Sequence, residues 1–301
     1  MGRTISPKSI NGWLAIDKQK GVSSASVVRK LKWLLKAKKA GHAGTLDPDA
    51  TGILAIALGE ATKTIPYVMD ALKSYQFDVV FGHTTDTDDA TGKIIKSSNL
   101  RPKNNEIKTI IKSFNGHIEQ VPPNFSAVKV KGERAYHISK NNDINFTLSA
   151  RPLWIKNLTL VTRVNKDLAT MEMTCGKGGY VRAIARDIGK RLGCYGHATN
   201  IRRTMSGPFT LSETIPSEKI FLELGHEIEK NILPIHTVLG HLISFECGRA
   251  DADKLQKGQN INLPILMKKQ NENALALLDS KPIAIGTHDK NKFYPKKVFV
   301  Y

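Results

Sequence analysis

The sequence predicts an α+β protein built on a mixed sheet, followed by a small β-rich module in the C-terminal part of the chain. Short strand-like and helix-like segments are interleaved over residues 12–193, without the regular β–α–β alternation of a parallel α/β fold. After about residue 237, strand-like segments follow one another with turns between them. We therefore expect a larger domain over residues 1–237 and a smaller module over residues 238–301, near the lower size limit for a domain.

Apolar periodicity predicts the elements of the larger domain. Alternating apolar and polar residues indicate strands, and apolar residues three or four positions apart indicate helices. The run ILAIAL at 53–58 is too short for periodicity to decide between the two. The expected strands are 12–16, 75–81, 158–164 and 169–175. The expected helices are 23–40, with Ser23 or Ser24 as its N-cap, then 60–72, 107–114 and 180–193.

The smaller module is expected to consist mainly of strands. Its apolar segments are short and separated by turn-forming residues, which is typical of a small β-rich unit. The expected strands are 242–246, 274–279, 282–289 and 296–301, with a glycine-bounded segment at 255–258.

Charge indicates the kind of partner. The chain carries 45 lysine and arginine residues against 27 acidic residues, which gives a formal net charge of +18 at pH 7. Such an excess favours a polyanionic partner, either a nucleic acid or an anionic membrane surface. The polar face of the helix expected over 23–40 is either solvated or contacts phosphate groups. That face carries Arg29, Lys30, Lys32, Lys36, Lys38 and Lys39, with no acidic residue among them.

Other features of the composition exclude several classes of protein. Apolar runs reach nowhere near the length of about eighteen residues that a membrane-spanning helix needs. Residues 1–13 are basic but lack the apolar core of a signal peptide. The three cysteines, Cys175, Cys194 and Cys247, form no CxxC pair, which argues against both a disulfide framework and a zinc knuckle. We therefore expect reduced thiols in a cytoplasmic protein without a membrane partner.

The segment GHAGTLDPDATG at 41–52 gathers turn-forming residues around one carboxylate, Asp47. Pro48 restricts the residue before it to an extended conformation, and the glycines let backbone or ligand approach closely. A carboxylate fixed on such a loop suits a preorganised nucleophile. Asp and Pro are also common turn residues, so a purely structural turn is the alternative interpretation.

Other motifs fit paired-acid, metal or nucleotide sites poorly. Asp47 and Asp49 flank a proline, so they do not easily converge on one glycosidic bond from opposite faces. The acidic run at 86–89 departs from an EF-hand loop, because Gly92 comes one place late and no glutamate stands at the twelfth position. We expect a solvated turn there. The glycines at 176–179 lack the GK[ST] of a P-loop. Since none of these motifs fits a metal or nucleotide site, the sequence predicts neither a metal nor a cofactor.

Tyr180 and Arg182 stand at the start of the helix expected over 180–193. An aromatic ring can stack on a nucleobase, and a guanidinium group can pair with a carboxylate or a phosphate. Both side chains are therefore candidate contacts for a nucleic-acid substrate.

A series of motifs between Gly12 and Phe209 resembles, in order, those of the TruB-type tRNA pseudouridine-55 synthases. One such motif could arise by chance, but the whole series in register could not. The motifs are GWLAIDKQKGVSS, GHAGTLDPDATGILAIALGEATK, KSYQFDVVFGHTTDTDDATG, VPPNFSAVKVKGERAY, KGGYVRAIARDIG and NIRRTMSGPF.

The resemblance implies a role for each matching residue. Asp47 stands at the aspartate of the GTLDPxATG motif and would be the catalytic nucleophile. His42 would lie beside it and contact the refolded RNA loop, and Tyr75 would stack on the target base.

The remaining matches would bind the substrate. Tyr180 would contact it, and Arg182 would pair with the catalytic carboxylate. Ile201 would contact the base through its backbone, and Lys18 belongs to the N-terminal motif near the site.

The resemblance also implies an activity and a partner. The protein would convert uridine 55 in the T loop of tRNA to pseudouridine, on a flipped-out base and without a cofactor. The GERAY element and the lack of long basic tails favour the stand-alone bacterial type over the guide-dependent synthases, so we expect a monomer that needs no protein partner. By analogy, residues 238–301 would be a PUA-like RNA-binding module. The alternative is a non-catalytic RNA-binding or RNA-folding protein on the same scaffold.

Two positions depart from the family pattern. Gln19 stands where the family usually has a proline, so this turn lacks the rigidity that a proline ring would give it. Asp49 places a second carboxylate two residues after Asp47, where an apolar residue is common, and we expect it to face the solvent.

Overall fold

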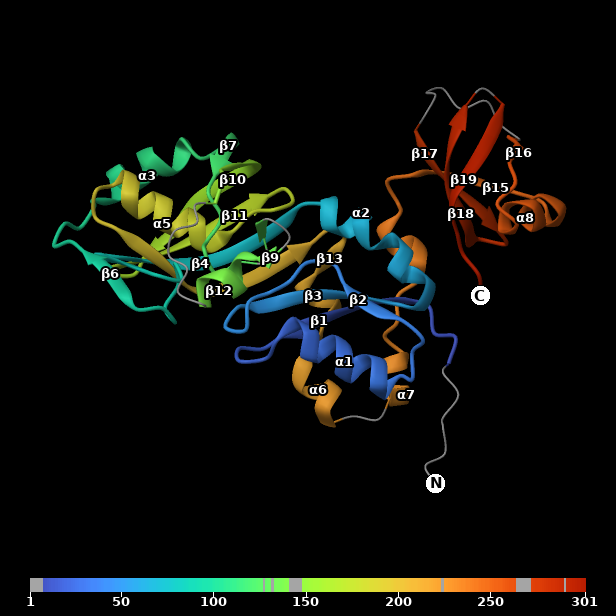
Figure 1. The fold of residues 1–301 in the computed structure, drawn as a ribbon, viewed down its shortest axis with the longest axis horizontal. Coiled ribbons are helices and arrows are strands. Elements are labelled where there is room, and N and C mark those ends of the chain that lie inside the picture. Colours follow the sequence, from blue (N-terminus) through green and yellow to red (C-terminus); the bar gives the residue numbers. More distant parts are fainter. Residues whose placement is uncertain are drawn as a thin grey trace.

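The computed structural model describes residues 8–126, 128–130, 133–140, 148–222, 225–263, 272–289 and 291–301. These residues form a ten-stranded mixed sheet flanked by helices, and a separate five-stranded sheet near the C-terminal end (Figure 1). The fold class expected from the sequence, α+β with a small β-rich C-terminal module, is confirmed. In the described part of the chain, no helix is long and apolar enough to cross a membrane.

The larger sheet has the strand order β14-β1-β3-β12-β4-β11-β10-β7, with β2 paired to β3 and β13 paired to β12. Its strands are β1 (Gly12–Lys18), β2 (Ala40–His42), β3 (Thr51–Leu58), β4 (Lys73–Phe81), β7 (Gly116–Gln120), β10 (Arg151–Arg163), β11 (Leu168–Cys175), β12 (Gly196–Ser206), β13 (Phe209–Thr210) and β14 (Ile215–Pro216). Two small hairpins are formed by β5 (His83–Thr85) with β6 (Ile94–Ser97), and by β8 (Lys129–Val130) with β9 (Glu133–Arg134).

The helices lie on two sides of this sheet (Figure 1). One group packs with β1 and β3, and α3 and α5 pack with β4, β10 and β11 around Phe77, Val79 and Phe81. The helices are α1 (Ser24–Leu34), α2 (Ile65–Asp70), α3 (Asn104–Lys112), α4 (Ala135–Lys140), α5 (Val181–Arg191), α6 (Ser217–Leu222) and α7 (Gly225–Glu229). Three short 3-10 helices are η1 (Gly59–Thr64), η2 (Leu211–Glu213) and η3 (Ile235–Val238).

β12 joins the two halves of the sheet. It runs parallel to β3, where Arg202 pairs with Thr51 and Arg203 with Gly52, and antiparallel to β4 along most of its length. Apolar periodicity predicts no strand at Gly196–Ser206, because the buried positions of β12 include the polar residues Arg203 and Ser206. Apolar periodicity cannot reveal a strand whose inward side chains are polar.

The run at 53–58 belongs to a strand, β3, that is buried on both faces. Ile53 and Ala55 pack in one core cluster, and Leu54 and Ile56 pack in another. A strand covered on both sides is continuously apolar, and this is why periodicity could not assign it. The expected helix at 60–72 is instead a 3-10 turn followed by the short α2.

The first helix begins as expected and ends earlier. Ser23 is its N-cap, and the Ser23 hydroxyl accepts a hydrogen bond from the backbone N–H of Ser26. The helix ends at Leu34, so the expected continuation to residue 40 is wrong. Lys38 and Lys39 therefore lie on the exposed segment that leads into β2, and not on the helix.

The C-terminal module has the strand order β15-β17-β18-β19-β16. It contains β15 (Ile243–Glu246), α8 (Arg249–Gln256), β16 (Ile261–Asn262), β17 (Asn273–Leu278), β18 (Lys281–Asp289) and β19 (Lys292–Val298). The expected segment at 255–258 is the end of α8. The division of the chain at residues 237/238 stays a prediction.

The module packs directly on the larger domain. One core cluster contains side chains from both parts, among them Trp13, Phe209, Val238, Leu275, Ile285 and Phe299. Lys63 of η1 donates to the carbonyl of Val298 at 2.7 Å, and Lys297 donates to the carbonyl of Lys63 at 2.8 Å. The two sheets therefore share an apolar contact with reciprocal hydrogen bonds at its edge.

We expect Phe299→Ala to lower the free energy of unfolding by about 3–5 kcal/mol, because truncating a buried aromatic ring leaves a cavity. The Phe299 ring is 0% exposed and packs in the cluster that joins the two parts. Val300→Ala is the control, because its side chain is 61% exposed, and it should change stability by less than about 0.5 kcal/mol. Denaturant unfolding followed by tryptophan fluorescence measures both. Equal stability of the two variants would contradict the shared core.

Candidate active site

Asp47 lies on the loop that connects β2 to β3. Gly44 has φ +115° and Gly52 has φ +95°, which is the conformational region that glycine adopts without strain. A Cβ atom on Gly52 would lie 2.2 Å from the carbonyl oxygen of Arg203. Only glycine therefore lets β3 approach β12 this closely at the end of the Asp47 loop.

Lys18, at the end of β1, fastens one side of this loop. Its ammonium group donates to the carbonyls of Gln19 at 2.9 Å, Val22 at 2.8 Å and Pro48 at 2.9 Å. The side chain is 0% exposed, and burial lowers the pKa of Lys18 to about 8, although the Asp47 carboxylate opposes the shift. All three ammonium protons are used on backbone carbonyls, so Lys18 positions the residue next to Asp47.

Arg203, on β12, fastens the other side. Its guanidinium group donates to the carbonyl of Ile53 at 2.7 Å and to the carbonyl of Gly44 at 3.0 Å, and the side chain is 1% exposed. Between these two cations, the Ser24 hydroxyl exchanges hydrogen bonds of 2.9 Å with the backbone N–H and carbonyl of Leu46. The loop is therefore held from β1, α1 and β12 at once.

Arg182 pairs with the candidate nucleophile, as the resemblance implied. Its Nε lies 2.9 Å from Oδ2 of Asp47 and 3.7 Å from Oδ2 of Asp89. The two terminal nitrogens donate to the carbonyls of Thr87 at 2.9 Å and Phe125 at 3.0 Å. The Arg182 side chain is 6% exposed and that of Asp47 is 44% exposed, so the guanidinium is fixed while the carboxylate stays accessible.

Tyr75 lies on β4, between Met173 of β11 and Arg203 of β12. Its ring is half-buried and packs against the core on that side of the sheet. Burial raises the pKa of Tyr75, while the neighbouring Arg203 guanidinium opposes the shift. The hydroxyl is therefore protonated at neutral pH, with Asp47 near enough to add to the shift.

Three other expected residues surround the same centre. Burial and the Arg203 guanidinium lower the pKa of His42, so its imidazole is neutral at pH 7, and its Nδ1 is buried without a hydrogen-bond partner among the described residues. Burial raises the pKa of Tyr180, which precedes α5. Ile201 lies on β12 and lines a small cleft with Asp47 and Asp89.

Sequence reasoning missed two residues of this site, Arg203 and Asp89. Arg203 belongs to the NIRRT motif at 200–204, so the family resemblance that indicated Ile201 could also have indicated Arg203. The expectation of a solvated turn at 86–89 is wrong, because Asp88 is 6% exposed and pairs with Arg186 at 2.8 Å. A sequence cannot show that arginines far along the chain neutralise these acids.

The two departures from the family pattern have structural consequences. Asp49 is exposed, as expected. The backbone N–H of Gln19 donates to the Ser217 hydroxyl at 3.1 Å, and a proline has no N–H with which to make this bond. The Gln19 turn is therefore held by a hydrogen bond in place of a ring.

The described part of the chain contains no group of three or more histidine, cysteine, aspartate or glutamate side chains placed to hold a metal ion. The three cysteines are free thiols, and burial raises the pKa of Cys175 to about 12.

The fold is shared with solved structures. One of them, "Crystal Structure of a Cbf5-Nop10-Gar1 Complex", has a TM-score of 0.72 and 22% sequence identity, covering 96% of this chain and 85% of that chain. The chain therefore shares its fold with that structure over nearly its whole length.

Sequence comparison gives the family. Residues 32–181 match the model of the TruB family pseudouridylate synthase N-terminal domain, and residues 182–239 match the tRNA pseudouridylate synthase B C-terminal domain. Proteins named tRNA pseudouridine synthase B from Ruegeria sp. (strain TM1040) and Cereibacter sphaeroides (strain ATCC 17023) are 45% and 46% identical, and each alignment covers 99% of both chains. The chain belongs to the TruB family of pseudouridylate synthases, and it is an isomerase.

We expect the pH dependence of stability to reveal the buried Lys18 ammonium. Its pKa rises from about 8 in the folded protein to 10.5 in the unfolded chain. Between these values the unfolded chain binds more protons, so stability should increase with pH, by about 1.4 kcal/mol per unit.

Comparison with Lys18→Met isolates this contribution, because Lys73, whose pKa is also lowered to about 8, is present in both proteins. Urea unfolding at pH 8 to 10.5 measures the two slopes. The Met variant should show a flatter slope. Identical slopes would mean that burial does not lower the pKa of Lys18.

Proposed function

We propose that this protein converts uridine to pseudouridine at position 55, in the T loop of tRNA, with Asp47 as the nucleophile. It acts alone, as a monomer in the cytoplasm, without a cofactor or a protein partner. The observation that carries the proposal is the accessible Asp47 carboxylate held 2.9 Å from the buried Arg182 guanidinium. The named relatives, tRNA pseudouridine synthases B, support tRNA as the substrate.

The reaction needs a carboxylate that can form a covalent bond to the uridine and then break it. The N1–C1′ glycosidic bond of uridine breaks, a C5–C1′ bond forms, the C5 proton is released to water and N1 takes up a proton, so product and substrate have the same composition. An ionised carboxylate can add to the base or to C1′ and then leave again. Arg182 pairs with the carboxylate and fixes its direction, because the other nitrogens of Arg182 are held by backbone carbonyls.

The target base must leave its stack to reach Asp47. Base flipping costs a few kcal/mol, and stacking on an aromatic side chain offsets part of that cost. The Tyr75 ring lies at the centre of the sheet beside Asp47 and Arg203. We assign Tyr75 to stacking on the flipped uracil, Ile201 to a backbone contact with it, and His42 and Tyr180 to contacts with the surrounding loop. Lys18 contributes by holding the Asp47 loop.

The rest of the tRNA arm is bound by charge. The net charge of +18 gives an attraction that weakens as the salt concentration rises, because the counterions that binding releases from the RNA then gain less entropy. We propose that residues 238–301, with their five-stranded sheet, act as a PUA-like RNA-binding module, distinct from a catalytic domain over residues 1–237.

We expect Asp47→Asn to abolish turnover while RNA affinity changes only a few-fold, because the nucleophile contributes to the transition state far more than to binding. Tritium release from C5-labelled uridine in a T-arm RNA measures turnover, and filter binding measures affinity. Asp49→Asn is the matched control: it removes the same charge from an exposed side chain two residues away, and activity should persist. An active Asp47→Asn variant would favour the non-catalytic RNA-folding alternative.

We expect Tyr75→Leu to reduce turnover by orders of magnitude, because the flipped base loses its stacking face, while Tyr75→Phe keeps that face. RNA affinity should weaken only modestly, since one stacking contact is worth about 1–3 kcal/mol. Phe77→Leu is the control, because Phe77 is a 0% exposed core ring on the same strand. It should lower the melting temperature without slowing turnover per folded molecule. A Tyr75→Leu variant that behaved like Phe77→Leu would assign the Tyr75 ring to the core.

A further inference from the structure

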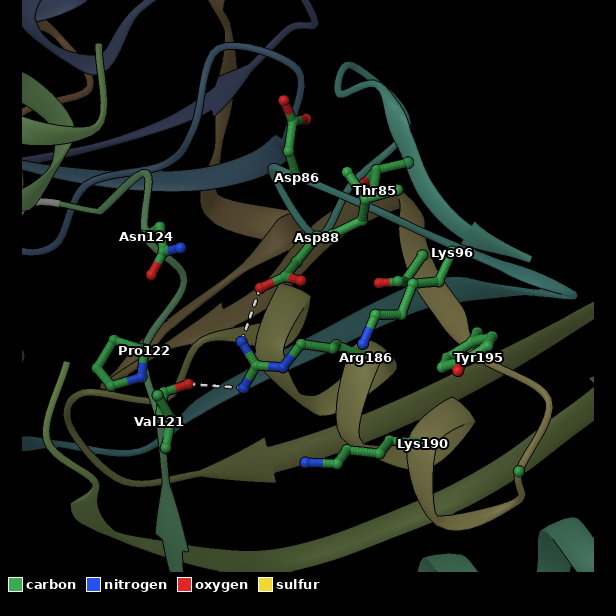
Figure 2. Close-up of a pocket in the computed structure, with 13 residues that line it drawn as sticks. Thr85, Asp86, Asp88, Lys96, Val121, Pro122, Asn124, Arg186, Lys190 and Tyr195 are labelled. Atoms are coloured by element: carbon green, nitrogen blue, oxygen red, sulfur yellow. Dashed lines mark hydrogen bonds and ion pairs between the residues drawn. The ribbon is translucent and has the colours of Figure 1, made fainter. Parts of the chain in front are cut away.

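A second cavity lies on the other side of the 86–89 segment from Asp47. It has a volume of about 510 Å³ and is lined by the β5–β6 hairpin, by residues 121–124 and by α5 (Figure 2). This volume is in the range of small-molecule sites. Among the described residues, none that lines it also lines the Asp47 cleft.

The cavity is lined by three basic side chains, Arg186, Lys96 and Lys190, and by the carboxylates of Asp86 and Asp88. Arg186 stands at its centre and is fixed by Asp88 at 2.8 Å and by the carbonyl of Val121 at 2.7 Å (Figure 2). Asp187 also pairs with Arg186, at 2.9 Å. Lys96 extends from β6 toward Arg186, and Lys190 projects from the next turn of α5 (Figure 2). Neither lysine forms an ion pair within the described ranges, which leaves two cations available for a phosphate group.

One wall of the cavity is aromatic. Tyr195 has φ 57°, in the left-handed region that an aromatic residue rarely adopts. Its backbone N–H donates to the carbonyl of Gly189 at 3.0 Å, and a Cβ on Gly189 would lie 2.3 Å from the Tyr195 carbonyl carbon. The close packing of the chain behind it holds Tyr195 in this conformation with its ring half-buried at the cavity. Strained residues of this kind cluster at binding sites.

We propose that this cavity binds a single nucleotide, with its base against the Tyr195 ring and its phosphate between Lys96 and Lys190. A stacking ring and two available cations match the base and the phosphate of that ligand. Where the nucleotide belongs to the RNA substrate, the inference rests on the proposed function.

The spacing along α5 supports this arrangement. Arg182 and Arg186 are four residues apart, so they lie on the same helix face, one turn from each other. Arg182 contacts Asp89, which lines the Asp47 cleft, and Arg186 contacts Asp88, which lines the second cavity. Two adjacent residues of one segment thus separate the two cavities, close enough for nucleotides of one RNA loop.

The test combines abasic RNA with variants of the wall. Each loop nucleotide of a T-arm RNA, other than the target uridine, is replaced in turn by an abasic residue, and affinity is measured with the full-length protein. We expect one replacement to weaken binding to the wild-type protein by about five- to a hundredfold, as loss of one stacking contact would. That loss should vanish in Tyr195→Asn, because asparagine suits a positive φ and removes the ring. Tyr195→Phe should restore it.

Charge is tested in the same way. Lys96→Ala combined with Lys190→Ala should weaken binding of the intact RNA more than Lys108→Ala, which removes an exposed lysine on α3 away from the cavity. Tritium release at saturating RNA should persist in every variant, so loss of the pocket is distinguishable from failure of the Asp47 chemistry.

A second arm distinguishes the source of the nucleotide. Calorimetric titration with UMP, CMP, AMP and GMP tests for a free nucleotide. Binding of one of them to the wild-type protein but not to Tyr195→Asn, with no abasic effect in RNA, would support the site and assign it a free ligand. If no abasic position depends on Tyr195 and no monophosphate binds, the proposal is overturned, while tritium release by the same wild-type protein leaves the proposed function standing.

Discussion

The position of Asp47 depends on two buried cationic side chains that donate hydrogen bonds to backbone carbonyls. Lys18 reaches the carbonyl of Pro48 from β1, and Arg203 reaches the carbonyl of Gly44 from β12. A buried charge is costly unless hydrogen bonds replace its water, and each of these cations finds at least two carbonyl partners. The loop that bears the carboxylate is thereby tied to the sheet from β1 and from β12. Chemistry that needs a fixed nucleophile can use such a loop without a metal to organise it.

The cleft lies where the two halves of the sheet meet. β12 is parallel to β3 and antiparallel to β4, so side chains from both halves face the same centre. Tyr75 comes from β4, Arg203 from β12, and Arg182 from the start of α5. The two aspartates that Arg182 contacts, Asp47 and Asp89, come from loops on opposite sides of this junction. The ion-pair network is therefore a product of the topology.

The sequence could predict what apolar periodicity and turn chemistry encode. The β4 alternation, the α5 face, the Ser23 cap and the β-rich end of the chain all follow from such patterns. It could not predict β12, whose inward positions include Arg203, nor the burial of Asp88, because their partners lie far away in the chain. Of the expected site residues, the structure brings Asp47 and Ile201 to one cleft, pairs Arg182 with Asp47, and shows that Lys18 supports the Asp47 loop. Buried polar side chains are positioned by their ion-pair and hydrogen-bond partners, and apolar periodicity in the sequence does not indicate those partners.

The core shared by Trp13 and Phe299 has a consequence for how the chain folds. These side chains meet in one cluster although almost the whole chain separates them, and the β1–β3 pair that carries Trp13 cannot cover that face until β18 and the segment after β19 arrive. Contacts of such long range slow folding, because the entropy of closing the chain must be lost before the contact forms. During synthesis the apolar surface around Trp13 would therefore stay open for most of the time the polypeptide is being made. Assembly of the larger sheet and acquisition of its final stability are thus separate events in the life of the molecule.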